Sequence, residues 1–225
     1  PVTPAELGSP ALNGILSHLQ NIDYLHEIVI VLGRTDKKED LVRTKEMFSV
    51  LPQEHCVIWA SGPRAAELYG VLEGAGLSAG DDGKGRSVWL AYGYILARDE
   101  SKIIALHDCD IVNYSRELLA RLCYPIASPR IEYAFCKGYY ARVTDRLHGR
   151  VTRLFYFPLV TSLIRIYGHL PFLTYLESFR YPLSGEFSMI TELARINRIP
   201  ADWGIEVETL AEVYRNYSLR RICQT

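Results

Sequence analysis

The chain has 225 residues, of which 48% are hydrophobic and 23% are charged, and its formal net charge is −1. This length and composition are sufficient to bury a sizeable core within one domain. The near-neutral charge leaves no broad basic field, so nucleic acid is disfavoured as a partner. The five cysteines show neither C-x-x-C pairs nor zinc-ligand spacing, which favours free thiols in a reducing cytoplasm.

No segment predicts a signal peptide or a membrane span. Residues 1–8 lack a basic start followed by an apolar run. The most apolar region, residues 154–164, contains Pro158 and ends at Arg165, well short of the ~20 residues that a spanning helix needs. We therefore expect a cytoplasmic protein without stable membrane insertion. Binding of an amphipathic segment to a membrane surface stays open.

The first half of the chain alternates between two patterns. A continuous apolar run rich in β-branched residues at 27–32 predicts a strand buried on both faces, a shorter run at 56–60 predicts a second strand, and the run at 102–106 predicts a third, buried strand. Stretches with helical character follow the first two strands and precede the third, at residues 37–50, 64–72 and 87–98, with a glycine-rich loop at 78–85. This alternation predicts an α/β fold with right-handed crossovers and a mostly parallel sheet.

The second half has a different pattern. Two strands are expected around Lys137 and Gly138, at residues 131–135 and 139–143. The remaining stretches predict helices, at residues 151–167, 172–179, 185–197 and 203–217. We expect one domain over 1–225 that divides at about residue 112. The half at about 1–112 is expected to bind a donor substrate and the half at about 113–225 an acceptor substrate. We also expect the domain to be incomplete at both ends.

Two aspartates directly follow the third expected strand, in the triplet Asp108-Cys109-Asp110. Side chains at i and i+2 of an extended segment point to the same side. Two carboxylates so close repel each other unless a cation or a donor lies between them. Mg²⁺ is typically held by one or two carboxylates together with substrate phosphates, as a nucleotide-sugar site requires. The alternative is that one aspartate caps the following helix.

Three further residues lie where a donor would bind. In open α/β sheets, ligands bind at the carboxyl ends of the strands. Gly33 and Arg64 follow the first and second expected strands, and Lys84 stands between two glycines before a helix. Glycines allow close approach to a phosphate, and a lysine supplies a point charge for a diphosphate. The alternative for Lys84 is a solvated lysine in a turn.

A second anion site is expected before the helix at 151–167. Arg150, Thr152 and the local backbone N–H groups are suited to bind a phosphate or a carboxylate. Further basic residues occur in the neighbouring sequence: Lys137, Arg142, Arg146 and Arg153. The alternative for this group is a solvated basic surface.

Two glutamates are candidates to bind sugar hydroxyls. Glu186 follows Gly185, and Glu206 belongs to a segment with Asp202 and Trp203, whose ring offers an apolar surface for a sugar. Both glutamates are equally explained as acids at helix N-termini, where the helix dipole favours them.

Six segments together resemble glycosyltransferase family 81, the retaining GT-A glucosyl-3-phosphoglycerate synthases. They occur in the family's order and span most of the chain: GKGRSVW at 83–89, ALHDCDIV at 105–112, FCKGYYARV at 135–143, GRVTRL at 149–154, PLSGEF at 182–187 and DWGIEV at 202–207. The combination is specific, although each segment alone is not.

The resemblance implies a Rossmann-like nucleotide-sugar-binding sheet of the GT-A type with a helical acceptor-side half. It implies that glucose passes from UDP-glucose to 3-phosphoglycerate with a divalent cation, Mg²⁺ or Mn²⁺. The product, glucosyl-3-phosphoglycerate, would be the first intermediate towards glucosylglycerate, a compatible solute. A homodimer built on the apolar helices after Thr152 is also an option.

The resemblance also assigns roles on the donor side. Asp108 and Cys109 would lie at the nucleotide, and Asp110 would be the metal ligand and part of the catalytic set. Lys84 would meet the diphosphate, and Glu206 would bind the glucose hydroxyls.

On the acceptor side, the resemblance implies that residues 149–152 bind the phosphate of phosphoglycerate: Gly149, Arg150, Val151 and Thr152. Leu183 would offer its backbone carbonyl to the reacting hydroxyl.

Two departures from the family occur. The family's second metal ligand is a histidine beyond the last helix, and no histidine follows His169 here. Residues 1–10 resemble a diverged donor loop.

Three other functions are consistent with the same sequence features. A GDP-mannose-dependent enzyme that makes mannosyl-3-phosphoglycerate would have the same fold. A polyprenyl-phosphate glycosyltransferase would place the aromatic stretch at 154–176 against a membrane. A non-catalytic sensor would bind the nucleotide-sugar without turning it over.

Overall fold

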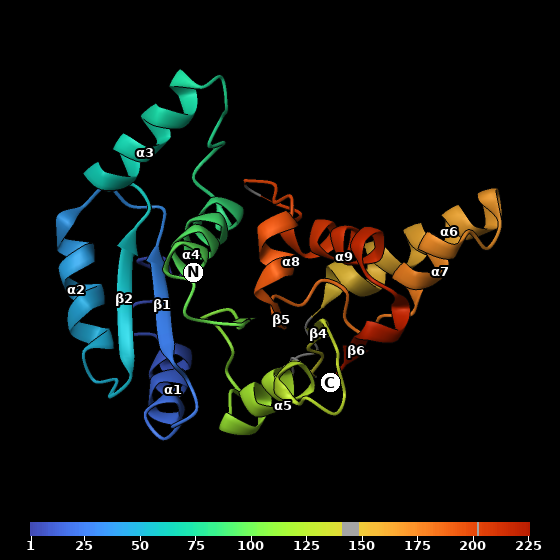
Figure 1. Cartoon of the computed structure of the whole chain (residues 1–225), viewed down its shortest axis with the longest axis horizontal. Helices are drawn as coiled ribbons and strands as arrows, with labels where there is room; N and C mark the ends of the chain where they lie inside the picture. The colour runs from blue at the N-terminus through green and yellow to red at the C-terminus, as the bar shows by residue number, and fades with distance from the viewer. Residues whose placement is uncertain (141–148, 202) are drawn as a thin grey trace. The chain divides into compact units, whose positions relative to one another are not determined.

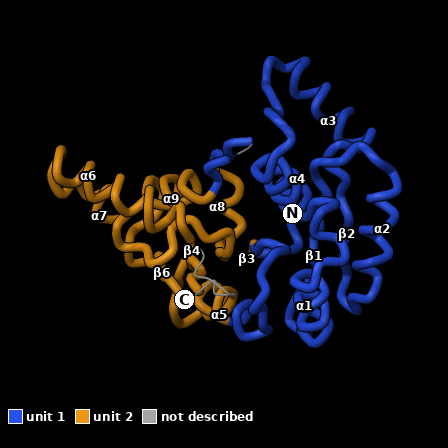
Figure 2. The backbone as a smooth tube through the Cα atoms, turned by 180° about the vertical axis from the view of Figure 1, so that it is seen from behind, with its two compact units in different colours: residues 1–102, 107–120, 198–205 blue, residues 103–106, 121–197, 206–225 orange. Residues whose placement is uncertain are grey.

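The computed structural model describes residues 1–140, 149–201 and 203–225. The chain divides into two compact units, coloured separately in Figure 2. Unit 1 consists of Pro1–Lys102, His107–Ala120 and Arg198–Ile205. Unit 2 consists of Ile103–Leu106, Arg121–Asn197 and Glu206–Thr225. The chain thus enters unit 2 between Lys102 and Ile103 and returns to unit 1 between Leu106 and His107.

Unit 1 is built on two parallel strands, β1 (Glu27–Leu32) and β2 (Glu54–Trp59). Both strands were predicted, and the first carries the β-branched run expected of a buried strand. Val2 adds a parallel bridge to Leu32. The helices of this unit are α1 (Pro10–Leu19), α2 (Lys38–Phe48), α3 (Pro63–Gly74) and α4 (Lys84–Arg98). Figure 1 shows α2 beside β2 and α4 beside β1.

The core of unit 1 joins β1, β2 and α4. Val31, Ala60 and Leu90 are buried against one another, and burial of such apolar side chains is the main favourable term in folding. This packing holds the N-terminal end of α4 near the carboxyl ends of both strands.

Two helix starts in unit 1 differ from the prediction. Helix α1 was not predicted, yet its start has a capping residue, since the Ser9 Oγ accepts from the Leu12 N–H at 3.1 Å and Pro10 follows it. Helix α4 begins at Lys84, three residues before the predicted start at residue 87. Lys84 therefore lies on the first turn of the helix and not in the loop before it.

Unit 2 holds a four-stranded sheet in the order β3-β5-β4-β6. Its strands are β3 (Ile103–Leu106), β4 (Phe135–Lys137), β5 (Phe187–Ile190) and β6 (Ile222–Gln224). Strand β3 was expected to extend a mostly parallel sheet, but it pairs antiparallel with β5. Strand β4 is antiparallel to β5 and parallel to β6. The described part of the chain thus mixes parallel and antiparallel pairing.

The prediction of a helix at 185–197 was wrong in its first part. Residues 187–190 form β5, and only α8 (Thr191–Ile196) is helical. Phe187, Ser188 and Met189 are all buried, and a short continuously buried run has no period that separates a strand from a helix. In place of the strand predicted at 131–135, the structure has the shorter strand β4, which begins at Phe135 and ends at Lys137. Tyr139 and Tyr140 are not in a strand, and residues 141–143 lie outside the described residues.

Of the other helical elements of unit 2, the first is the helix expected after the Asp108 triplet, the last is a short turn that was not predicted, and the rest match their predicted stretches closely. These elements are α5 (Arg116–Ala127), which enters from unit 1, the π-helix η1 (Thr152–Tyr156), α6 (Phe157–Tyr167), α7 (Pro171–Glu177), α9 (Ile205–Asn216), whose first residue belongs to unit 1, and the 3₁₀ turn η2 (Leu219–Arg221). Among the described residues, none of the helices combines the length and apolar character that crossing a membrane requires.

Candidate donor and acceptor sites

The strongest candidate site in unit 1 is an ion pair between Lys84 and Asp108. Lys84 Nζ lies 2.6 Å from Asp108 Oδ1, and the two side chains are only 27% and 26% exposed. Burial alone would raise the pKa of Asp108, but the Lys84 ammonium outweighs it and lowers that pKa below its usual value. The lysine is therefore no freely solvated turn residue, and the carboxylate is held ionised beside it. The structure brings together these two expected donor residues.

The other two residues of the Asp108 triplet have different surroundings. The Cys109 thiol is directed to the carbonyl of Pro1, 3.2 Å away, and burial raises its pKa to about 12. This contact ties the triplet to the segment that resembles a donor loop. Asp110 is exposed, so its carboxylate is accessible to an ion from solvent.

A fully protein-made metal cage is not found in the described residues, which contain no group of three or more His, Cys, Asp or Glu able to hold a metal ion. One exposed carboxylate next to the candidate donor residues still suits Mg²⁺ or Mn²⁺, because such ions accept a few carboxylates plus substrate phosphates and water. Asp110 fits that limited role.

Sequence reasoning missed Asp82, which links the carboxyl ends of both parallel strands to α4. Its Oδ2 accepts from the Arg34 backbone N–H at 3.0 Å and from the Ser61 Oγ at 2.9 Å. Its Oδ1 pairs with the Arg86 guanidinium at 3.1 Å. Arg34 has φ +57, a left-handed conformation that costs a non-glycine residue roughly 1–2 kcal/mol. The spacing of four residues between Asp82 and Arg86 was the only local signal of this arrangement.

Arg86 extends the network from Asp82 to three other segments. Its guanidinium lies 4.8 Å from the centre of the Tyr69 ring and donates to the Gly80 carbonyl at 3.2 Å. Its backbone N–H donates to the Ala201 carbonyl at 2.7 Å. These contacts fix the first turn of α4, on which Lys84 lies.

Two glycines allow close packing at the same place. A Cβ on Gly33 would lie 2.9 Å from Ser87 Oγ, and a Cβ on Gly85 would lie 1.7 Å from the Pro200 carbonyl oxygen. The expected donor residue Gly33 thus lets α4 approach the end of β1. Because glycine has no side chain, at a donor site it would offer only its backbone and the space that it leaves.

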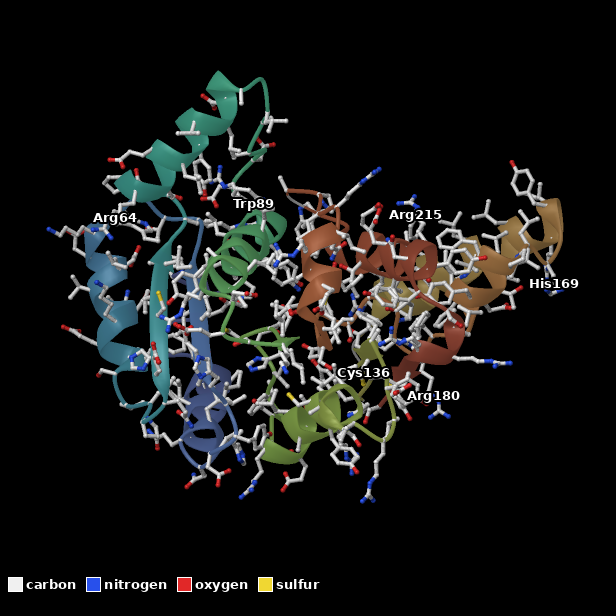
Figure 3. The ribbon with its side chains drawn as sticks, viewed as in Figure 1. Arg64, Trp89, Cys136, His169, Arg180 and Arg215 are labelled. Atoms are coloured by element: carbon white, nitrogen blue, oxygen red, sulfur yellow. The ribbon has the colours of Figure 1, made fainter. Side chains whose placement is uncertain are left out.

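Arg64, the remaining expected donor residue of unit 1, is the second residue of α3 and is exposed (Figure 3). No hydrogen bond or ion pair joins it to Lys84 or Asp108 in the described structure. The structure does not bring it into their network.

In unit 2, the expected acceptor residues lie at the start of a helix. Arg150 and Val151 are helical, the π-helix begins at Thr152, and α6 continues it. Gly149 precedes them with φ +84, a conformation that favours glycine. Thr152 is buried, whereas Arg150 is exposed. The first N–H groups of a helix with an arginine beside them make a suitable site for an anion.

The basic surface expected near this helix is only partly present. Lys137 is 1% exposed, so it is no member of a solvated basic surface, while Arg153 is exposed. Arg142 and Arg146 lie outside the described residues. The sequence shows that several basic residues are near one another but not which of them are buried, so it could not distinguish Lys137 from its basic neighbours.

Leu183 and Glu206 occupy defined positions in unit 2. Leu183 is half-buried in the turn before β5, where the Ser184 N–H donates to the Tyr181 carbonyl at 3.2 Å. Glu206 is half-buried on the first turn of α9. Trp203 is 80% exposed, which leaves its ring accessible to a ligand, and Asp202 lies outside the described residues.

Two relatives match the whole chain. It is 53% identical over 224 residues to the glucosyl-3-phosphoglycerate synthase of Persephonella marina and 42% identical over 228 residues to that of Methanococcoides burtonii. Each match covers 100% of this chain and 55% of the relative, so the chain spans about half the length of these relatives. No protein-family model matches the chain. The resemblance predicted from the six segments is confirmed as similarity along the entire sequence.

Solved structures of the Mycobacterium tuberculosis glucosyl-3-phosphoglycerate synthase share the fold. The complex of that enzyme with Mn²⁺, UDP and glucosyl-3-phosphoglycerate matches with a TM-score of 0.69 at 18% identity, covering 99% of this chain and 67% of that one. Its complex with Mn²⁺, UDP-glucose and phosphoglyceric acid matches with a TM-score of 0.67 at 18% identity, covering 97% and 65%. The predicted α/β glycosyltransferase fold is thereby confirmed.

Proposed function

We propose that this chain carries the donor and acceptor sites of a retaining glycosyltransferase that moves glucose from UDP-glucose to 3-phosphoglycerate and yields glucosyl-3-phosphoglycerate. The observation that carries the proposal is the half-buried ion pair between Lys84, on the first turn of α4, and Asp108, which follows β3. Strand ends and helix N-termini are where α/β proteins bind nucleotides. Relatives at 53% and 42% identity bear the name of this activity.

On the donor side, Lys84 would stabilise the negative charge that develops on the leaving UDP. Its ammonium is a compact charge already fixed by Asp108 and by the first turn of α4. A charge that is held in place before the reaction needs little rearrangement as the bond breaks, which makes this kind of stabilisation large. Asp108 would orient Lys84 and lie at the nucleotide, with Cys109 anchoring the triplet.

Asp110 would hold a divalent cation, Mg²⁺ or Mn²⁺, together with the diphosphate oxygens. When bound, the ion supplies positive charge for the leaving diphosphate. Solved complexes of the mycobacterial enzyme contain Mn²⁺ with UDP-glucose, which supports a cation in the proposed reaction.

On the acceptor side, residues 149–152 would bind the phosphate of 3-phosphoglycerate through the helix N-terminus and the Arg150 guanidinium. Fixing that phosphate places the acceptor hydroxyl, and positioning of this kind supplies a large part of a rate enhancement. Leu183 would accept from the hydroxyl through its backbone carbonyl, and Glu206 would bind the glucose hydroxyls. We name no protein nucleophile; the leaving phosphate would take the acceptor proton on the same face of the sugar.

The deciding experiment is a panel of donors and acceptors tested on the full-length protein, with Mg²⁺, with Mn²⁺ and with a chelator. We expect release of UDP only when UDP-glucose and 3-phosphoglycerate are both present, and loss of that release with the chelator. Turnover of GDP-mannose in place of UDP-glucose would assign the mannosyl enzyme instead. Binding of UDP-glucose without turnover of any acceptor would assign a sensor.

Two further expectations belong to the same proposal. The five cysteines are free, in keeping with the expected cytoplasmic location. Several apolar side chains of η1 and α6 are exposed, among them Leu154 at 72% and Ile166 at 71%, and a homodimer would cover them. Mass measurement by light scattering tests the dimer.

A further inference from the structure

Lys137 is a buried lysine with a specific hydrogen bond. It is the last residue of β4, its side chain is 1% exposed, and its Nζ donates to the Ser184 carbonyl at 2.6 Å. The Nζ also lies 5.3 Å from the centre of the Phe187 ring, on the strand that pairs with β4. The end of β4 is therefore tied to the turn that contains Leu183 and Ser184.

Burial of a lysine needs a reason, because removal of an ammonium from water is costly and a well-packed apolar side chain at such a place is often as stable or more stable. The lysine Nζ is a donor only. Its charge shortens and strengthens the bond to a carbonyl oxygen. Lys137 thus offers something that an apolar residue lacks, namely a fixed orientation for the Ser184 carbonyl.

Two more hydrogen bonds hold the same turn to the residue after Lys137. The Ser184 Oγ donates to the Gly138 carbonyl at 2.7 Å, and the Gly138 N–H donates to the Glu186 carbonyl at 2.9 Å. A Cβ on Gly138 would lie 3.1 Å from the Glu186 Cβ, so glycine permits this close approach. Residues 184 and 186, which flank Gly185, are thereby both attached to the residue that directly follows β4.

These bonds also set the direction of the Leu183 carbonyl. The Ser184 N–H donates to the Tyr181 carbonyl at 3.2 Å. Because a trans peptide is planar, the Leu183 carbonyl points opposite to that N–H. Lys137 fixes the carbonyl on the other side of Ser184. The two peptide planes that flank Ser184 are consequently both held.

We propose that Lys137 is a positioning residue for the transfer step: its ammonium holds the Ser184 carbonyl and thereby keeps the Leu183 carbonyl aimed at the acceptor hydroxyl. The inference rests on the proposed function, in which that carbonyl meets the hydroxyl. Lys137 itself touches neither substrate. Its loss acts on the geometry of transfer and not on binding of the nucleotide, whose proposed contacts Lys84 and Asp108 come from unit 1.

The test compares Lys137→Met with the unmodified full-length protein. Methionine keeps an unbranched apolar stem and deletes the ammonium. A displacement of about 1 Å at a reacting group costs roughly 100-fold in rate, so we expect kcat for glucosyl transfer to fall by about that factor. The dissociation constant of UDP, measured by calorimetry, is expected to stay within about twofold.

A pair of serines supplies a matched control that does not depend on the folding of Lys137→Met. Ser184 and Ser188 are both buried, and the Oγ of each donates to a backbone carbonyl, of Gly138 and of Leu122 respectively. Only Ser184 belongs to the turn. We expect Ser184→Ala to lower kcat about 10-fold and Ser188→Ala to leave kcat within about twofold, at similar losses of Tm.

The outcomes separate the inference from the proposed function. A wild-type protein that transfers no glucose from UDP-glucose to 3-phosphoglycerate refutes the proposed function. Activity in the wild type with an unchanged kcat in Lys137→Met overturns the positioning role alone. If Lys137→Met does not fold, equal kcat values in Ser184→Ala and Ser188→Ala overturn it instead.

Discussion

The Nζ of Lys84 lies 2.6 Å from Oδ1 of Asp108, although the two residues are 24 positions apart and one lies on a helix while the other follows a strand. The packing of α4 against β1 and the hydrogen bonds around Asp82 keep the first turn of α4 in place. Two of the residues selected from sequence for the donor thus meet in one contact. This contact connects the first turn of α4 to the acidic triplet.

Replacement of Lys84 by methionine is expected to lower kcat/KM for UDP-glucose by about 100- to 1,000-fold, because one preorganised group that stabilises a developing charge contributes on this scale. Steady-state kinetics with varied UDP-glucose measure it. Lys37→Met, which changes an exposed lysine before α2, is the matched control and should behave like the wild type. A loss below threefold for Lys84→Met would remove this lysine from the diphosphate site.

Replacement of Asp110 by asparagine is expected to abolish cation-dependent turnover. The amide keeps the size of the side chain but removes the charge that a hard cation prefers. Binding of Mn²⁺ in the presence of UDP, followed by electron paramagnetic resonance, should weaken at least 10-fold, because loss of a residue that only supports a metal ligand already costs about 10- to 100-fold in affinity. Asp99→Asn, at the end of α4 and exposed, serves as control. Unaltered Mn²⁺ binding by Asp110→Asn would refute the role of this carboxylate as a ligand.

The sequence-based predictions were accurate where a feature depends on consecutive residues and failed where it depends on contacts between residues distant in the sequence. Strand β1 and the position of Asp108 could be predicted because a buried strand is recognisable as a run of consecutive apolar residues. The role of Asp82 could not, since two of its partners, Arg34 and Ser61, are distant in sequence. Strand β5 was assigned to a helix because its buried run carries no period. Its antiparallel pairing with β3 depends on contacts between residues more than 80 positions apart.

Replacement of Arg150 by alanine is expected to raise the KM for 3-phosphoglycerate about 10- to 100-fold, because a charge-assisted hydrogen bond to the phosphate is lost. The KM for UDP-glucose should change little. Arg165→Ala, on an exposed arginine in the last turn of α6, is the control for a general loss of positive charge. An acceptor KM that is the same in both variants would show that Arg150 does not bind the acceptor phosphate.

Replacement of Asp82 by asparagine is expected to affect both stability and the donor. The amide cannot serve as the anionic partner of Arg86 while it also accepts from Arg34 and Ser61. Loss of hydrogen bonds to a charged group should lower the free energy of unfolding by about 1–2 kcal/mol, measured by urea denaturation. Because the first turn of α4 loses an anchor, the affinity for UDP should also fall, by about 3- to 10-fold. Asp36→Asn changes an exposed aspartate beyond β1 and should alter neither quantity. A destabilised Asp82→Asn protein that binds UDP as tightly as the wild type would limit Asp82 to holding the strands together.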